Sequence, residues 1–296
     1  AVPRMLGRRE FRNVDLAEIA ALIDWAPFFQ AWELSGPYPA ILEDPVVGEA
    51  ARNVLAEGRD MLRWIIDGRW LTANGAIALW PANSIVDDIE IYGDESRQRV
   101  LFTWHGLRQQ NQRPPGKPNY ALSDFVAPKG SGVRDYIGAF AVTTGLGIEK
   151  HLAAYAEKKD DYNAIMLKAL ADRLAEAFAE WLHRKVRREL WGYAPNEALD
   201  ADALVREEYR GIRPAPGYPA CPDHAVKRPL FEALHAYELG MSVTESFAML
   251  PAASVAGFYL SHPQATYFAV GRIGQDQADD FERRAGYRLE PTITGY

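Results

Sequence analysis

Cysteine is almost missing from the sequence, since Cys221 is the one cysteine among 296 residues. A lone thiol excludes an internal disulfide and a zinc site built from cysteines alone, so nothing points to secretion. No apolar run reaches the roughly 18 residues that a membrane-spanning helix needs, and the first ten residues lack the apolar stretch of a signal peptide. We therefore expect a cytoplasmic protein without a membrane-spanning segment.

The common motifs for nucleotides and metals are missing as well. There is no Gly-x-Gly-x-x-Gly and no phosphate-binding loop; residues 144–150 come nearest to the first pattern but lack its third glycine. The histidines are scattered, with no helical pair at metal-ligand spacing, and we predict no metal site. They are His105, His151, His183, His224, His235 and His262.

The chain has fewer basic than acidic residues, 33 against 40, which gives a net charge of -7. This balance argues against a general nucleic-acid binder, and it suits a cationic small ligand or a basic protein surface. The hydrophobic fraction of 48% is ordinary for a globular protein. A chain of this length can bury a large core and needs no disulfide or structural metal ion for stability. Because the chain does not begin with methionine, we expect a fragment of a longer protein.

Apolar residues at a spacing of three to four predict helices, and short β-branched runs predict strands. The strongest helical pattern breaks near residues 158–161, where Asp160 or Asp161 would cap the second helix. The predicted helices cover residues 19–29, 45–66, 151–191, 202–209 and 232–239. The predicted strands cover residues 76–80, 89–92, 100–104, 122–126, 136–142, 254–260 and 266–270, the last two as a hairpin. Irregular interspersion of the two types favours an α+β fold with a largely antiparallel sheet.

Residues 211–224 stand apart because they hold four prolines within nine residues. Repeated proline fixes φ and removes amide donors, so the segment must be a rigid extended loop. Such a loop presents backbone groups to a ligand at little ordering cost. Arg213 suits a carboxylate, and Tyr218 offers an aromatic face and a hydroxyl. A purely structural loop, with Arg213 in an ordinary ion pair, is an equally open interpretation.

Three acids follow one another at i, i+4 positions on the long helix, namely Asp172, Glu176 and Glu180. Each like-charge pair costs a few tenths of a kcal/mol unless a cation lies nearby. Either basic neighbours relieve the repulsion in solvent, or the face meets a positive group from elsewhere. The basic neighbours are Arg173, His183 and Arg184.

Two further segments hold polar groups of open role. Asp24 lies between Ile23 and Trp25, where an acid is either a cap for a nearby amide or a site residue. Cys221, Asp223 and His224 could suggest nucleophilic chemistry, but a plain buried thiol is the better interpretation.

Several segments together resemble one known family. They are residues 23–29 (Ile-Asp-Trp-Ala-Pro-Phe-Phe), 80–83 (Trp-Pro-Ala-Asn), 87–92, 160–182, 191–197, 211–222 and 245–249. In this order they resemble the C-terminal activation domain of cobalamin-dependent methionine synthase, over nearly the whole chain. The resemblance implies a single C-shaped α+β domain over residues 1–296, with a twisted antiparallel sheet flanked by long helices. It also implies a shallow groove for S-adenosylmethionine.

The resemblance places the family's ligand contacts on specific positions. They are Asp24, Glu176, Glu207, Arg213, Ala215, Tyr218, Tyr267 and Phe268. Relatives are expected to carry tyrosine at position 268, so here a backbone contact would survive and a hydroxyl contact would not. Asp172 matches a residue that meets a histidine of the cobalamin module when that histidine leaves cobalt. Residues 143–151 fit least well, and no role is transferred to them.

The implied activity is reductive methylation of cobalamin, as part of a methyltransferase of methionine biosynthesis. An electron from a flavodoxin-like or other reductase converts oxidised cobalamin to a form that attacks the sulfonium methyl. The protein's task is then to place the methyl above the corrin, and Tyr218 at the loop tip is the candidate residue that faces it. The isolated chain is not expected to turn over without the cobalamin-binding module.

Two alternatives come from other classes of function. The chain could be a docking module that grips the cobalamin module and its reductase without its own ligand chemistry. It could also be a free-standing methyltransferase for a small molecule, although the missing glycine loop and the missing general base count against this.

Overall fold

A six-stranded antiparallel sheet forms the base of the molecule in this computed structural model, which describes residues 1–294. The strand order is β4-β3-β2-β5-β8, and β1 pairs with part of β2 beside this path. The strands are β1 (Gly7–Phe11), β2 (Thr72–Ile85), β3 (Asp88–Tyr92), β4 (Val100–Trp104), β5 (Asp135–Leu146) and β8 (Ser254–Tyr259). A separate pair joins β6 (Ser242–Val243) to β7 (Met249–Leu250).

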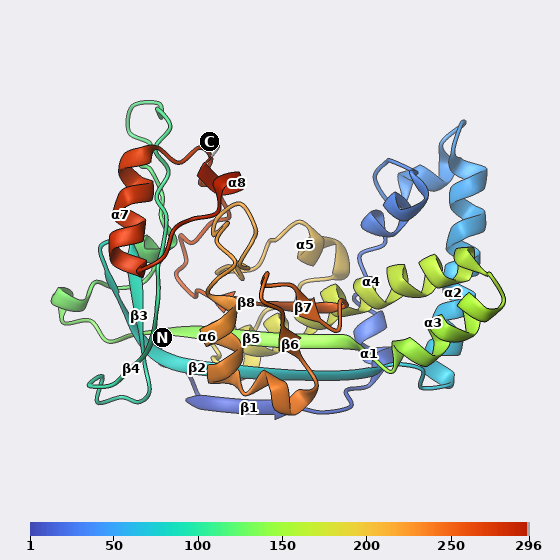
Figure 1. Cartoon of the computed structure of the whole chain (residues 1–296), viewed down its shortest axis with the longest axis horizontal. Coiled ribbons are helices and arrows are strands. Elements are labelled where there is room, and N and C mark those ends of the chain that lie inside the picture. The colour runs from blue at the N-terminus through green and yellow to red at the C-terminus, as the bar shows by residue number, and fades with distance from the viewer. Residues whose placement is uncertain (295–296) are drawn as a thin grey trace.

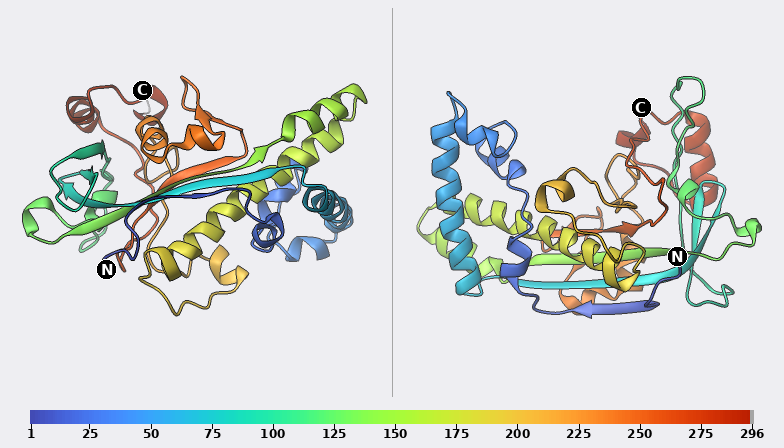
Figure 2. Two further views of the ribbon diagram at one scale, coloured as in Figure 1. Left: turned by 90° about the horizontal axis from the view of Figure 1, so that it is seen from below. Right: turned by 180° about the vertical axis from the view of Figure 1, so that it is seen from behind.

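Helices cover both faces of this sheet. They are α1 (Leu16–Ala20), α2 (Gly48–Asp67), α3 (Ile148–Glu157), α4 (Asp161–Lys185), α5 (Ala201–Val205), α6 (Lys227–Leu234), α7 (Gln275–Ala285) and α8 (Pro291–Thr294). The long helix α4 lies on one face and α6 on the other (Figure 2). Two arms rise from the base, one built around α2 and the other around α7, so that the molecule has the outline of an open C (Figure 1). The expected α+β fold is confirmed.

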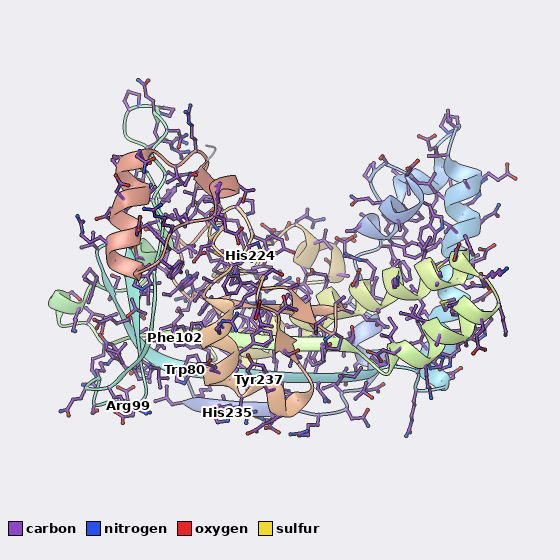
Figure 3. The ribbon with its side chains drawn as sticks, viewed as in Figure 1. Trp80, Arg99, Phe102, His224, His235 and Tyr237 are labelled. Carbon is purple, nitrogen blue, oxygen red and sulfur yellow. The ribbon has the colours of Figure 1, made fainter. Side chains whose placement is uncertain are left out.

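The alternation of side chains along β2 divides the interior into two cores. Ile77 and Leu79 point into the core beneath α4, whereas Ala76, Ala78 and Trp80 point into the core beneath α6. In the second core the rings of Trp80 and Phe102 meet edge to face at 6.1 Å (Figure 3). Because both faces of the central strands are covered, β2 and β5 are buried along almost their whole length.

Helix α4 begins where the sequence predicts it. Asp160 is the N-cap, and its carboxylate accepts a hydrogen bond from the Asn163 backbone N–H at 3.1 Å. The preceding helix α3 ends at Glu157, so the predicted break at residues 158–161 is confirmed. A π-helical turn (Val186–Leu190) then extends α4 toward Trp191.

The predicted helix over residues 19–29 is wrong. Helix α1 ends at Ala20, and a separate 3₁₀ helix, η1 (Ala26–Trp32), begins after it. Two local features separate them: the Asp24 carboxylate accepts a hydrogen bond from the Ala26 N–H at 3.1 Å, and Pro27 occupies the first turn of η1.

Two predicted strands are also wrong. Residues 122–125 form a 3₁₀ helix, because the Asp124 carboxylate accepts a hydrogen bond from the Ala121 N–H at 3.0 Å and closes a turn. Residues 266–270 form no strand, because the place beside β8 is taken by the proline-rich loop. There the Phe258 N–H donates to the Pro214 carbonyl at 2.9 Å.

Other elements differ only in extent or were not predicted. The predicted helix 202–209 is the shorter α5, and 232–239 is divided between α6 and a 3₁₀ helix, η6 (Ala236–Leu239). Strand β1 and helices α7 and α8 were missed. Helix α7 is almost entirely polar, and its buried residues are Gln277 and Phe281, so its sequence carries too few apolar residues for a periodic signal.

Candidate functional site

A cleft of about 700 Å³ lies in the concave side of the C. Its walls come from the segment around the start of η1, helix α4, helix α5 with the residues after it, the proline-rich loop and residues 267–269. Strands β5 and β8 each add one residue, Phe140 and Val255. The eight residues expected to contact a ligand all line it. They are Asp24, Glu176, Glu207, Arg213, Ala215, Tyr218, Tyr267 and Phe268.

The proline-rich loop is fixed to the edge of the sheet. Ile212 and Leu260 exchange two backbone hydrogen bonds at 3.0 Å, which places the loop beside the end of β8. The loop then turns at residues 215–221, where the Tyr218 N–H donates to the Ala215 carbonyl at 3.1 Å. The predicted loop is thus confirmed, and the sheet edge supports it.

Gly217 allows the turn at the loop tip. Its φ is +90°, and a Cβ atom there would lie 2.1 Å from Cε1 of His224. Only glycine accommodates both the left-handed backbone and the imidazole packed against it. This close packing presents Tyr218 at the rim of the cleft, where 57% of the residue remains exposed.

Arg213 is held on both its side chain and its backbone. Its Nη2 donates to Oε2 of Glu180 at 2.8 Å, and its Nη1 lies 3.0 Å from Nδ1 of His183. Its backbone N–H donates to the Tyr267 hydroxyl at 2.9 Å, and this hydroxyl lies 2.6 Å from that of Tyr209. The acidic face of α4 therefore does meet a cation from elsewhere, and the ion pair of Arg213 forms part of the cleft wall.

Three further carboxylates line the cleft, those of Asp24, Glu176 and Glu207. Asp24 caps the Ala26 amide at 3.1 Å, so it combines both roles that its sequence position suggested: a cap and a cleft residue. Glu176 lies one helical turn before Glu180, and its charge raises the pKa of Tyr218, with burial as the second cause. The cleft thus sets several negative charges around the partly buried guanidinium of Arg213.

Glu207 holds an uncommon backbone conformation in the cleft wall. Its φ is +58°, in the left-handed region that a residue with a Cβ seldom occupies. Partial desolvation raises the pKa of its carboxyl, Arg213 opposes this shift, and Glu180 adds to it. Strained backbone at a cleft is typical of residues retained for binding.

The remaining predicted residues differ in how closely they approach the cleft. Phe268 lines it and packs its ring 5.7 Å from that of Tyr120, so it contributes an apolar surface without a hydroxyl. Asp172 does not line the cleft; it is exposed on α4, one turn before Glu176. Among the lining residues that were not predicted are Leu22, Pro27, Arg173, Leu204 and Val205.

Cys221 forms no pair with His224. Its thiol donates to the Ala215 carbonyl at 2.9 Å, and burial raises the pKa of the thiol. His224 instead faces Lys227, whose Nζ lies 2.9 Å from Nδ1. Cys221 and His224 therefore do not form a pair of nucleophile and base. Within residues 1–294 no cluster of His, Cys, Asp or Glu is suited to hold a metal ion.

Comparison with known proteins identifies the family of this chain. The family model described as "Vitamin B12 dependent methionine synthase, activation domain" matches residues 15–286. The chain belongs to this family. This chain is also similar to the MetH reactivation domain, which has been crystallised bound to AdoHcy, with 52% sequence identity and a TM-score of 0.92. The match covers 97% of this chain and 88% of the crystallised one.

Family membership confirms the resemblance inferred from the sequence. The activation domain belongs to cobalamin-dependent methionine synthase, a methyltransferase with several modules, one of which carries the cobalamin. A free-standing methyltransferase is therefore not supported. Among the helices of residues 1–294, none combines the length and apolar character needed to cross a membrane.

Proposed function

We propose that this activation domain binds S-adenosylmethionine in the cleft and holds its methyl group toward the cobalamin module of the same enzyme. The observation that carries this proposal is the convergence of eight residues from five separate parts of the chain on one cleft of about 700 Å³. This volume suits a ligand of nucleoside size. The related MetH reactivation domain was crystallised with AdoHcy, which is S-adenosylmethionine without the methyl group.

The charges of the cleft fit those of the ligand. S-adenosylmethionine has a sulfonium, an ammonium and a carboxylate. In our proposal Arg213 binds the carboxylate, since guanidinium and carboxylate form paired hydrogen bonds. Asp24, Glu176 and Glu207 offer negative charge to the sulfonium and the ammonium. The backbone of the loop around Ala215 binds the adenosine.

The residues of this chain orient the methyl group and need no general base. A reduced cobalamin, when its module docks, supplies the nucleophile that accepts the methyl. The rigid loop and the ion pair of Arg213 limit the motion of the bound ligand, which lowers the entropy lost on reaching the reactive geometry. Tyr218, exposed at the rim, is proposed to face the corrin, and Asp172 to meet a histidine of the cobalamin module.

We also propose the wider setting of the domain. Residues 1–296 act as one domain in a cytoplasmic enzyme of methionine biosynthesis. A flavodoxin-like or other reductase supplies the electron, and it meets the enzyme while the cobalamin module faces the cleft.

Calorimetric titration with S-adenosylmethionine and AdoHcy tests the binding site. Arg213→Ala should weaken binding of both ligands by roughly 30-fold or more, because the carboxylate of the bound ligand loses its charged partner. Arg210→Ala is the matched control: this exposed arginine contacts the Ser261 carbonyl outside the cleft, and its loss should leave affinity unchanged.

Two outcomes would contradict the proposal. Equal affinity of wild type and Arg213→Ala would remove Arg213 from the site. If the wild type bound neither ligand but still bound a cobalamin-loaded module, the domain would be a docking module without ligand chemistry.

A further inference from the structure

Arg213, in the wall of the cleft, contacts two side chains of α4 on successive turns. Glu180 and His183 stand three residues apart, so both face Arg213 from one side of the helix. Each binds a different terminal nitrogen of the guanidinium, at 2.8 and 3.0 Å. A planar group gripped at two nitrogens cannot rotate about its long axis without breaking one of the bonds.

The hydrogen bond to His183 defines the state of its imidazole. Arginine has only donors, so Nδ1 of His183 must accept, and the ring is neutral with its proton on Nε2. The ring is fully buried, stacked against Tyr259 at 5.2 Å and edge-on to Tyr209 at 4.7 Å. Burial lowers the pKa of His183 well below its usual value, and the nearby Arg187 and Arg213 lower it further.

Free arginine side chains have large rotamer entropy. Arg213 faces a cleft that also contains Asp24, Glu176 and Glu207. Without a fixed partner its guanidinium could pair with these acids and neutralise the charges proposed to meet the sulfonium. The contacts from α4 hold it on one wall instead.

We propose that Glu180 and His183 are positioning residues that hold the Arg213 guanidinium in the orientation that receives the α-carboxylate of the ligand. This inference rests on the proposed function and extends it from residues that touch the ligand to residues that act through Arg213. It predicts that these two side chains matter only for ligands with an amino-acid end.

Two ligands separate this role from a general structural one. AdoHcy has the α-carboxylate, whereas 5′-methylthioadenosine keeps the adenosine and the thioether but lacks the amino-acid end. Glu180→Gln removes the negative charge that faces Nη2, and His183→Leu removes the acceptor that faces Nη1. Each change should weaken AdoHcy binding by roughly tenfold. Binding of 5′-methylthioadenosine should change by less than about twofold. His183→Asn, which keeps an acceptor near Nδ1, should restore AdoHcy binding in part.

Glu197→Gln is the matched control. The Glu197 carboxylate is also buried, but it pairs with Arg187 at 2.6 Å and does not line the cleft. Its replacement should lower the melting temperature and leave the ratio of the two ligand affinities unchanged.

A double-mutant cycle gives a second readout that needs only AdoHcy. In an Arg213→Ala background, Glu180→Gln should have no further effect on the dissociation constant, because its partner is already gone. Additive effects in this cycle, equal weakening of both ligands by Glu180→Gln, or unchanged AdoHcy binding in Glu180→Gln would each overturn the inference. Failure of the wild type to bind AdoHcy would instead contradict the proposed function.

Discussion

At the scale of single residues, His183 has an environment that excludes its charged form. The ring is fully buried, and the charged groups around it are Arg187, Arg213 and Glu180. The native protein therefore keeps the ring neutral at a pH where the unfolded chain already binds a proton. A neutral ring is also what the hydrogen bond from Arg213 requires.

This environment predicts a loss of stability in acid. Because the folded pKa of His183 is depressed, the unfolded state binds more protons below about pH 6.5, and stability falls as the pH decreases from there. By pH 5.5 the loss should be on the order of 1 kcal/mol. Denaturant unfolding at pH 7.5 and pH 5.5 should show this loss in the wild type and not in His183→Asn. An identical pH dependence of both proteins would disprove it.

Residue patterns predicted part of the candidate site, and the resemblance to the family supplied its eight ligand contacts. The spacing of Asp172, Glu176 and Glu180 left open whether a cation from elsewhere meets this face, and the prolines indicated a rigid loop that contains Arg213. No sequence pattern predicted that Arg213 pairs with Glu180. The two residues are 33 positions apart and meet only because the loop lies along β8.

At the scale of elements, α4 is the part that the sequence predicts best. Its apolar stripe, its start and its cap are all local properties, set by residues within a few positions of one another. The wrong strand over residues 266–270 has the opposite property, because its outcome depends on a remote segment. Residues 266–270 have the composition of a strand, but the edge that they would have joined is occupied by residues 212–214, which the sequence pattern of either segment does not reveal.

The cap of α4 supplies a prediction at this scale. Asp160→Ala should lower the melting temperature by roughly 1–3 °C, because the first turn of α4 loses the acceptor for the Asn163 amide. Asp161→Ala is the control, since Asp161 lies in the first turn without making the capping bond. Thermal unfolding followed by circular dichroism measures both, and an equal shift in the two variants would show that helix-end charge, rather than the cap, matters.

At the scale of the whole molecule, the cleft combines charges from distant parts of the chain. Four carboxylates and two guanidiniums line it, so negative charge is in excess. A ligand with a sulfonium carries one more positive charge than the same ligand after methyl transfer. We therefore expect the product to bind more weakly than the methyl donor.

Salt should reduce this difference. At low ionic strength S-adenosylmethionine should bind several-fold more tightly than AdoHcy, and the ratio should approach one near 1 M salt, where the Debye length is about 3 Å. Calorimetric titrations at low and high sodium chloride measure the ratio. Glu176→Gln should lower it at low salt, and a ratio of one at low salt in the wild type would contradict the electrostatic explanation.

The sequence by itself determined the local structure and the chemical character of this protein. Helical spacing, the Asp160 cap, the proline-stiffened loop and the excess of acidic residues depend on neighbours in the chain, so they can be read without coordinates. Only the tertiary structure decided which charges meet. The orientation of Arg213 between Glu180 and His183 and the single cleft shared by Asp24 and Glu207 arise because the sheet edge and α4 bring remote segments together, and such long-range contacts leave no local signal.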